Sequence, residues 1–180
     1  MEQSKQNGPT SGRKQLAVIL IMALCSLGGS YALFFAAQDG ERWGTTNNGT
    51  FVQPVVTVDQ LQWQTPDGVP LSTSSQWWLW TVADQCDVVC AEALQKLRAA
   101  HILLNKEAKR VRRGITTGPA FVIPDDQPDL FRIQSLREQT PEGIYIVDPN
   151  GNLVFFYPLD INPKLLLADL KRLLKVSQIG

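Results

Sequence analysis

The fold of this chain is organised around the stretch Gln76-Trp77-Trp78-Leu79-Trp80-Thr81-Val82-Ala83-Asp84-Gln85-Cys86-Asp87-Val88-Val89-Cys90. Its first part, 76–83, is rich in aromatic and β-branched residues, which predicts a buried strand. The segment that follows it, 91–100, consists of good helix formers and predicts a helix. Cys86 and Cys90 therefore lie at a strand-to-helix junction, where residues i and i+4 share one face of a helix.

This position predicts a chemical role for the two cysteines. The positive end of a helix dipole favours the thiolate, the form of cysteine that attacks disulfides and binds metals. We therefore predict that Cys86 and Cys90 are a redox pair able to form a disulfide, with Cys86 exposed before the helix and Cys90 shielded in its first turn. Asp87 either opposes the Cys86 thiolate by its charge or caps the helix. The alternative is that both cysteines are buried and inert.

Composition excludes several classes of function. The chain of 180 residues has 17 basic and 17 acidic side chains, so its net charge gives no case for nucleic-acid binding. It has three cysteines and one histidine, which argues against a structural zinc site and against a catalytic centre built from several histidines. His101 lies about three helical turns beyond Cys90. We expect it to be a packed or half-exposed helix residue, with a metal-ligand role as the alternative.

The N-terminal part of the chain contains a long apolar run, LAVILIMALCSLGGSYALFFAA at 16–37. About 20 apolar residues span a bilayer as a helix, so this run predicts a transmembrane helix in which Cys25 is a small apolar residue. The alternative is a signal peptide cleaved near Ser30-Tyr31-Ala32. We favour an uncleaved anchor because the apolar run continues past that site.

The charges that flank the apolar run predict its orientation. Arg13 and Lys14 precede it, and Asp39 and Glu41 follow it. The positive-inside rule then places the tail 1–15 in the cytoplasm and the rest of the chain outside. The predicted location is the bacterial inner membrane, with a linker or a surface loop over 38–53 and a periplasmic domain over 54–180.

The remaining elements of the domain follow from turn signals and apolar periodicity. The expected elements are a leading β-hairpin within 55–71, a strand at 110–116, a loop at 117–127, a short helix at 129–138, strands at 143–147 and 152–157 around the turn 148–151, and a helix from Pro163. With the strand at 76–83 and the first helix, the order is β, α, β, α, β-hairpin, α. This is the order of the thioredoxin fold, so we predict an α/β, thioredoxin-like domain behind one transmembrane helix.

The proline at 141 fits this fold. Thioredoxin-like proteins commonly keep a cis-proline just before the third strand, facing the cysteines. Thr140-Pro141 stands at that place, so Pro141 is a candidate cis-proline. The alternative is an ordinary turn proline.

Several features together resemble the Sco/SenC proteins, which assist assembly of the copper centre of cytochrome c oxidase. They are the membrane anchor, the Asp67-Gly68 hairpin, the C-x3-C spacing of Cys86 and Cys90, and the hairpin stretch 145–152. Thioredoxins and most thiol oxidoreductases use C-x2-C instead. The resemblance implies a factor for oxidase assembly whose partners are the membrane, a cytochrome c oxidase subunit or other assembly factors.

The chain also departs from the Sco pattern. Sco proteins usually have proline after each cysteine, where this chain has Asp87 and Ala91. Their copper-binding histidine would fall near Thr140, where no histidine occurs. The resemblance therefore implies Cu(I) handling by the Cys86 and Cys90 thiolates alone, or no copper. The alternative functions are a membrane-tethered thiol–disulfide oxidoreductase of the periplasm and a non-catalytic assembly scaffold.

A basic run occupies 106–113 and contributes five positive charges. The simplest interpretation is a solvated face of the domain. The alternative is docking to an acidic partner or to anionic lipid headgroups.

Overall fold

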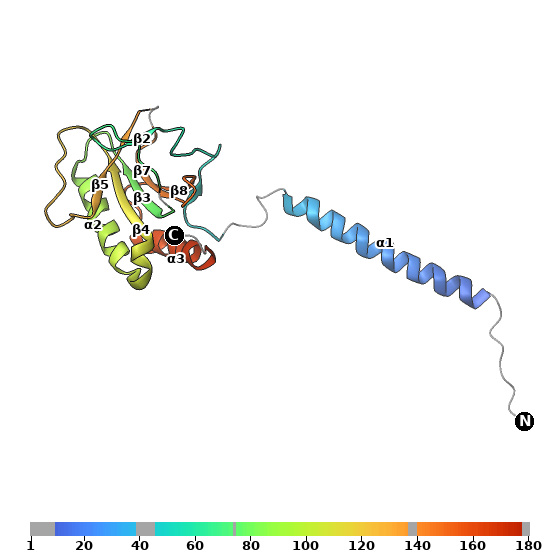
Figure 1. Ribbon diagram of the computed structural model, residues 1–180. Coiled ribbons are helices and arrows are strands. Elements are labelled where there is room, and N and C mark those ends of the chain that lie inside the picture. Colours follow the sequence, from blue (N-terminus) through green and yellow to red (C-terminus); the bar gives the residue numbers. More distant parts are fainter. Residues whose placement is uncertain (1–9, 39–45, 74, 137–139, 178–180) are drawn as a thin grey trace, which may run out of the picture. The chain divides into compact units, whose positions relative to one another are not determined.

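The computed structural model describes residues 10–38, 46–73, 75–136 and 140–177 (Figure 1). The chain divides into two units, Met1–Thr46 and Asn47–Gly180.

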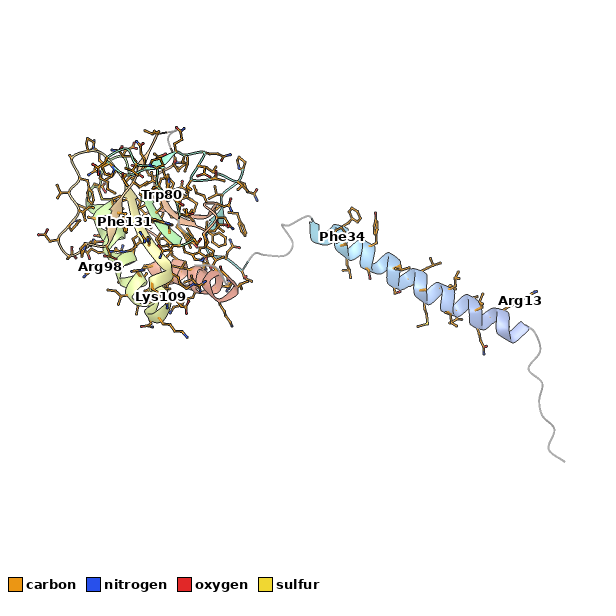
Figure 2. All side chains as sticks on the ribbon, viewed as in Figure 1. Arg13, Phe34, Trp80, Arg98, Lys109 and Phe131 are labelled. Atoms are coloured by element: carbon orange, nitrogen blue, oxygen red, sulfur yellow. A yellow bond between two sulfur atoms is a disulfide. The ribbon has the colours of Figure 1, made fainter. Side chains whose placement is uncertain are left out.

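The first unit contains one long helix, α1 (Thr10–Gln38). Its stretch Gly12–Ala36 has a mean hydropathy of 2.1 and is long and apolar enough to cross a membrane. The described apolar side chains, such as Phe34, are exposed around the helix (Figure 2). The hydroxyls of Ser26 and Ser30 donate to carbonyl oxygens one turn earlier, so they satisfy their hydrogen bonds within the helix.

The second unit is built on a six-stranded mixed sheet. The strand order is β1 (Thr50–Phe51), β8 (Leu153–Tyr157), β7 (Gly143–Val147), β3 (Trp77–Val82), β4 (Val111–Thr116) and β5 (Leu130–Arg132). The predicted strand with the tryptophans is thus central, and every residue of β3 is buried. It pairs in parallel with β4 and antiparallel with β7, which explains its apolar side chains on both faces.

One face of the sheet is covered by helices. α2 (Val88–Ile102) and α3 (Pro163–Val176) contact each other, and η1 (Asn105–Arg110) joins α2 to β4. Leu79 and Ile146 of the sheet pack with Leu97 of α2 and Leu170 of α3 in one apolar cluster. α3 begins as the sequence predicts, with Asn162 accepting a hydrogen bond from the Lys164 amide and Pro163 in the first turn.

The opposite face is covered by the chain that precedes β3. Trp63 stacks edge-on against Trp78 and Trp80, with ring centroids 5.9 and 4.7 Å away. Trp63 belongs to β2 (Trp63–Gln64), which pairs with β6 (Gln134–Ser135). This layer packs closely on the sheet at Gly114, where a Cβ atom would lie 2.4 Å from Ile133 Cδ1 and would require that side chain to shift.

The predicted helix at 129–138 is wrong in the described residues 129–136. The apolar spacing of Leu130, Ile133 and Leu136 suits a helix, but the backbone of this segment bonds to other strands. β5 extends the sheet beside β4, and the Ile133 amide donates to the carbonyl of Ile115 (2.8 Å). The Leu136 amide donates to the carbonyl of Leu61 (3.2 Å). Pairing with distant strands thus overrides the local pattern.

The predicted leading hairpin forms only in part. A turn closes at Gly68, whose amide donates to the Thr65 carbonyl (2.9 Å), and Leu71 and Trp63 pair across it (2.8 Å). Residues 55–58 do not belong to this hairpin. Val58 instead donates to the Gly151 carbonyl (2.9 Å), so this segment lines the β7–β8 turn.

The folded unit begins earlier than the predicted Pro54. Asn48 and Gly49 amides donate to the buried carboxylate of Asp169 on α3 (2.6 and 3.0 Å), and the Tyr157 hydroxyl donates to the same oxygen (2.9 Å). The segment 47–53 that we predicted to be linker is therefore part of the domain, with β1 as its edge strand. Burial, and then the hydrogen bond and charge of Asp169, raise the pKa of Tyr157 above its ordinary value. The hydroxyl thus stays a donor at neutral pH.

Part of the predicted solvated basic face lies inside the domain. Arg113 is 2% exposed, and its guanidinium donates to both carboxylate oxygens of Asp129 (2.7 and 3.3 Å) and to the side chain of Gln127 (2.8 Å). Burial raises the pKa of Asp129, but the hydrogen bond and charge of Arg113 outweigh burial and lower it overall.

We expect Asp129→Ala to lower the free energy of unfolding by about 2–3 kcal/mol, because it leaves the buried Arg113 charge without a carboxylate. Because the Asp129 pKa is lowered in the folded state, this stabilisation is present above the ordinary Asp pKa. It is lost as the pH falls through the folded-state pKa. Urea unfolding at pH 6 and pH 3 should therefore show a smaller effect at pH 3. Asp126→Ala removes only surface contacts and serves as the control.

Candidate redox site

The predicted disulfide joins Cys86 and Cys90, with their Cα atoms 5.0 Å apart. Cys90 is fully buried, whereas Cys86 is half-buried. The bridge closes a very short loop, so it contributes little to stability compared with a long-range bridge. Cys86 is thus the member of the pair nearer to solvent, and disulfide exchange requires one accessible sulfur.

The start of α2 positions the pair. α2 begins at Val88, and the Asp87 carboxylate accepts a hydrogen bond from the Cys90 amide (3.1 Å). Asp87 is therefore the N-cap of the helix, one of the two roles that the sequence left open. Cys86 lies just before the cap and Cys90 in the first turn, as predicted.

The floor of the site is apolar. Cys90 packs in a cluster with Ala83 at the end of β3, Leu94 of α2, Ile115 of β4 and Leu130 of β5. Four partly buried side chains pack against this cluster: Cys86, Phe121, Ile123 and Leu159. The β5 strand that replaced the predicted helix thus supplies part of this floor.

Arg132 holds the loop beside the disulfide, and sequence reasoning missed this role. Its guanidinium donates to the carbonyl oxygens of Gly118 (2.6 Å), Phe121 (2.5 Å) and Thr117 (3.4 Å). The Gly118 amide donates to the Asp84 carbonyl (3.0 Å), which ties the loop to the turn before Cys86. No sequence signal identifies Arg132, because its partners are backbone carbonyls of a loop.

Exposed apolar side chains occur in the first turn of α2, between the two cysteines, and in the loop 117–127. Val88 and Val122 are 74% and 81% exposed, and Val89 is also exposed. A groove of about 490 Å³ runs between α2 and the loop, lined mainly by apolar atoms of residues such as Val88, Leu94 and Phe121. Exposed apolar surface at a reactive bond is typical of a site that meets another protein.

The candidate role of Pro141 needs a correction. Within the described residues the cis peptide bond is Gln53–Pro54, and the Thr140–Pro141 bond is not cis. The Pro141 carbonyl accepts a hydrogen bond from the Tyr145 hydroxyl (2.9 Å), and burial raises the pKa of Tyr145 to about 12. The next residue, Glu142, accepts a hydrogen bond from the Asp84 amide (2.6 Å). Pro141 therefore lies at the same end of the sheet as the cysteines, in a trans turn.

A metal at the site would have two thiolate ligands from this chain. In the part of the chain that the structure describes, no group of three or more His, Cys, Asp or Glu side chains could hold a metal ion. His101 lies at the far end of α2, where its Nε2 bonds the carbonyl oxygens of Ala108 and Val111 (2.9 Å each). Two thiolates suit Cu(I), but they lack the nitrogen or oxygen donors that Cu(II) prefers.

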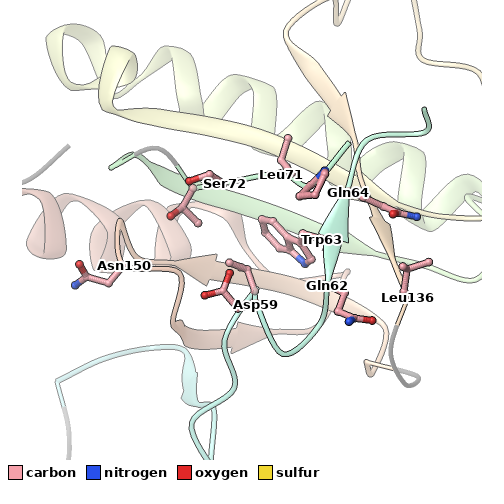
Figure 3. A pocket seen from close by; sticks show the side chains of 11 residues that line it. Asp59, Gln62, Trp63, Gln64, Leu71, Ser72, Leu136 and Asn150 are labelled. Atoms are coloured by element: carbon pink, nitrogen blue, oxygen red, sulfur yellow. The ribbon is translucent and has the colours of Figure 1, made fainter. Parts of the chain in front are cut away.

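Another hollow, of about 550 Å³, lies in the layer on the opposite face of the sheet (Figure 3). Trp63, Asp59 and Asn150 line it, and neither cysteine of the disulfide does. We therefore do not assign this hollow to the redox site.

The model of one protein family, described as "Transmembrane-like, thioredoxin-like, C-terminal domain", matches residues 77–177. The chain belongs to this family. The family match and the apolar helix α1 indicate a single-pass membrane protein. Among curated proteins, no sequence match was found.

Solved structures agree with the predicted fold. The apo Sco1 protein from Thermus thermophilus is 18% identical with a TM-score of 0.50, and the match covers 72% of this chain and 99% of that chain. Copper-bound ScoI from Arabidopsis thaliana is 15% identical with a TM-score of 0.47, covering 62% of this chain and 93% of that one. A thiol:disulfide interchange protein from a Bacteroides species is 12% identical with a TM-score of 0.44, covering 72% and 91%. The thioredoxin-like fold and the Sco-like resemblance in fold are thus confirmed.

Proposed function

We propose that this protein is a membrane-anchored, Sco-like thiol–disulfide redox factor that reduces cysteines of a partner during assembly of a haem–copper oxidase. The observation that carries the proposal is the Cys86–Cys90 disulfide at the start of α2, with Cys86 toward solvent and Cys90 buried. The domain lies outside the cytoplasm, in the bacterial periplasm, because the basic residues Arg13 and Lys14 precede the apolar run 16–37.

The proposed chemistry is a two-electron exchange. In the reduced protein, the Cys86 thiolate attacks a disulfide of the partner, and one partner sulfur leaves as a thiolate that takes up a proton. The Cys90 thiolate then attacks the Cys86 sulfur of the mixed disulfide. This forms the Cys86–Cys90 bond and releases the second partner sulfur. A dithiol donor outside the cytoplasm returns the two electrons to this protein.

Two features support a protein partner with copper-binding cysteines. The exposed apolar surface of Val88, Val89 and Val122 fits a protein surface better than a small polar thiol. The C-x3-C spacing of the pair resembles the Sco proteins, whose target is the copper centre of cytochrome c oxidase. Copper binds cysteine as the thiolate, so a partner with oxidised cysteines must be reduced first.

The redox proposal is tested by equilibrating the full-length protein, in a Cys25→Ser background, with mixtures of oxidised and reduced dithiol. Alkylation and mass spectrometry then report the fraction of Cys86 and Cys90 that is reduced. A single two-electron transition between the potentials of thioredoxin and of strongly oxidising proteins supports exchange at this site. A bond that resists reduction over the whole range indicates the non-catalytic scaffold instead.

We expect the reduced protein to bind Cu(I) through Cys86 and Cys90 and to form no Cu(II)–thiolate centre. Titration against a Cu(I) chelator should show binding that the Cys86→Ser/Cys90→Ser variant loses. Cu(II) should give no charge-transfer absorption, because the described residues supply no third donor. Such a band in the native protein would reveal a third ligand, and His101→Ala would be the first variant to examine. Failure of both ions to bind would leave thiol redox as the function.

A further inference from the structure

The basic run at 106–113 separates into two groups in the folded protein. Arg113 is buried, and Arg110 donates to the carbonyl oxygens of Leu174 and Ser177 at the end of α3 (2.9 Å each). Arg112 lies over the aromatic rings of Trp78 and Phe131 and donates to Gln76. The arginines therefore have structural partners, and the two lysines of the run remain for another role.

These two lysines belong to a larger basic surface. Because Arg110 joins η1 to the end of α3, Lys106 and Lys109 lie beside the C-terminal turn of α3. α3 adds a stripe of two lysines one turn apart on its solvent side, opposite the buried Leu166 and Leu170. We call the exposed set beside the C-terminal end of α3 the lysine face: Lys106, Lys109, Lys171 and Lys175.

The lysine face has the composition of a surface that meets lipid headgroups. None of its four ammonium groups has a salt bridge to a carboxylate in the described part of the chain. Exposed apolar side chains lie at the same end: Ile102 and Leu103 at the end of α2 and Val176 at the end of α3, at 60%, 56% and 80% exposed. Figure 2 shows Lys109 at the margin of the folded unit. Lysines beside exposed aliphatic groups are typical of surfaces that lie on anionic bilayers.

The chain between α1 and the folded unit is short. Only residues 39–46 separate the end of α1 from Asn47, and a chain of that length reaches at most about 30 Å when fully extended. Asn48 and Gly49 are bonded to Asp169 on α3, the helix that carries the lysine stripe. A short tether makes the contact intramolecular, so even a weak attraction suffices to dock the domain.

We propose that the lysine face docks on anionic phospholipid headgroups of the membrane that α1 spans. α2 and α3 both run from the disulfide end of the domain toward η1, and α2 is about 22 Å long. Docking through the end of these helices therefore turns the Cys86–Cys90 disulfide away from the lipid and toward partners. The proposal depends on α1 as the anchor and not on the direction of thiol exchange.

The test uses the full-length protein in vesicles of phosphatidylcholine alone or with about 30% phosphatidylglycerol. A membrane-impermeant reagent acetylates exposed lysines, and mass spectrometry gives the rate at each position. We expect acetylation of the lysine face to slow several-fold in the anionic vesicles, and added salt to reverse the effect. Lys96, which pairs with Glu92 on α2 (3.4 Å), is the internal control and should not change.

A charge-reversal variant sharpens the test. Lys171→Glu with Lys175→Glu should abolish the protection of Lys106 and Lys109, since each lysine near an anionic surface strengthens binding roughly fivefold. Lys96→Glu is the matched control. If the double variant does not fold, the salt dependence of acetylation in the wild-type protein still tests the proposal. Equal acetylation rates in neutral and anionic vesicles would overturn the proposal. Protection that occurs only in native membranes, and that protease treatment of their proteins removes, would also overturn it in favour of an acidic protein partner.

Discussion

Replacing Cys86 with serine is expected to reduce disulfide exchange by this protein to background. Cys86 is the half-buried member of the pair, and Cys90 is fully buried under Leu94 and Ile115. An attacking thiolate must reach its target sulfur in line, so the buried sulfur cannot start the reaction. The assay is reduction of a protein disulfide by the reduced full-length protein in a Cys25→Ser background.

Cys90→Ser is the matched variant and should behave differently. It keeps the attack by Cys86 but removes the sulfur that resolves the mixed disulfide, so the partner should remain covalently bound to Cys86. Mass spectrometry of the trapped complex would identify that partner and distinguish an oxidase subunit from a general periplasmic substrate. Alkylation of the reduced wild type should be fast at Cys86 and slow at Cys90. Equal and slow labelling of both thiols would support the inert pair instead.

Asp169→Ala is expected to lower the free energy of unfolding by about 3 kcal/mol and the melting temperature by about 10 °C. The carboxylate is 1% exposed and accepts from the Asn48 and Gly49 amides, from the Asn48 side chain (3.0 Å) and from the Tyr157 hydroxyl. Removal of the carboxylate leaves the two backbone amides and the Tyr157 hydroxyl without this acceptor at a buried site. Thermal unfolding followed by circular dichroism measures the effect.

Two variants separate the parts of this interaction. Tyr157→Phe removes one donor and should cost about 1 kcal/mol. Asp160→Ala changes an exposed carboxylate before α3 and should alter stability by less than about 0.5 kcal/mol. If Asp169→Ala unfolds at the same temperature as Asp160→Ala, Asp169 does not bind residues 48–49 in solution.

Elements with a clear local signal were predicted close to their observed bounds. They are β3, α2, the β7–β8 hairpin and α3, whereas the apolar helix α1 was predicted from residue 16 and begins at Thr10. Each has a periodic or continuous apolar pattern and a recognisable start or turn. The turn at 148–151 is an example, because Asp148 accepts hydrogen bonds from the amides of Asn150 and Asn152, and Gly151 has a φ of 88°. The positions of Cys86 and Cys90 followed from the same local signals.

Elements that depend on a distant partner were not predicted. The segment 130–136 has helical spacing but forms β5 and β6 because β4 and β2 offer unpaired backbone groups beside it. We predicted that residues 47–53 belong to a linker. They are part of the domain, because the Asn48 amide donates to Asp169 and β1 pairs with β8. The sequence did not identify Arg132, which holds the loop beside the disulfide, because its hydrogen-bond partners are backbone carbonyl oxygens.

The sequence by itself determined most elements of the thioredoxin-like domain, the long apolar helix and the place of the two cysteines at a strand-to-helix junction, since these depend on neighbours within a few residues along the chain. Only the tertiary structure decided which charged residues are buried, which loop lies beside Cys86 and which lysines share one face. Arg113 and Lys109 show the difference, because they are close in sequence, yet Arg113 is buried and paired with Asp129, whereas Lys109 is exposed. Composition could not separate them, since burial of a charge depends on a partner that the fold brings from elsewhere in the chain.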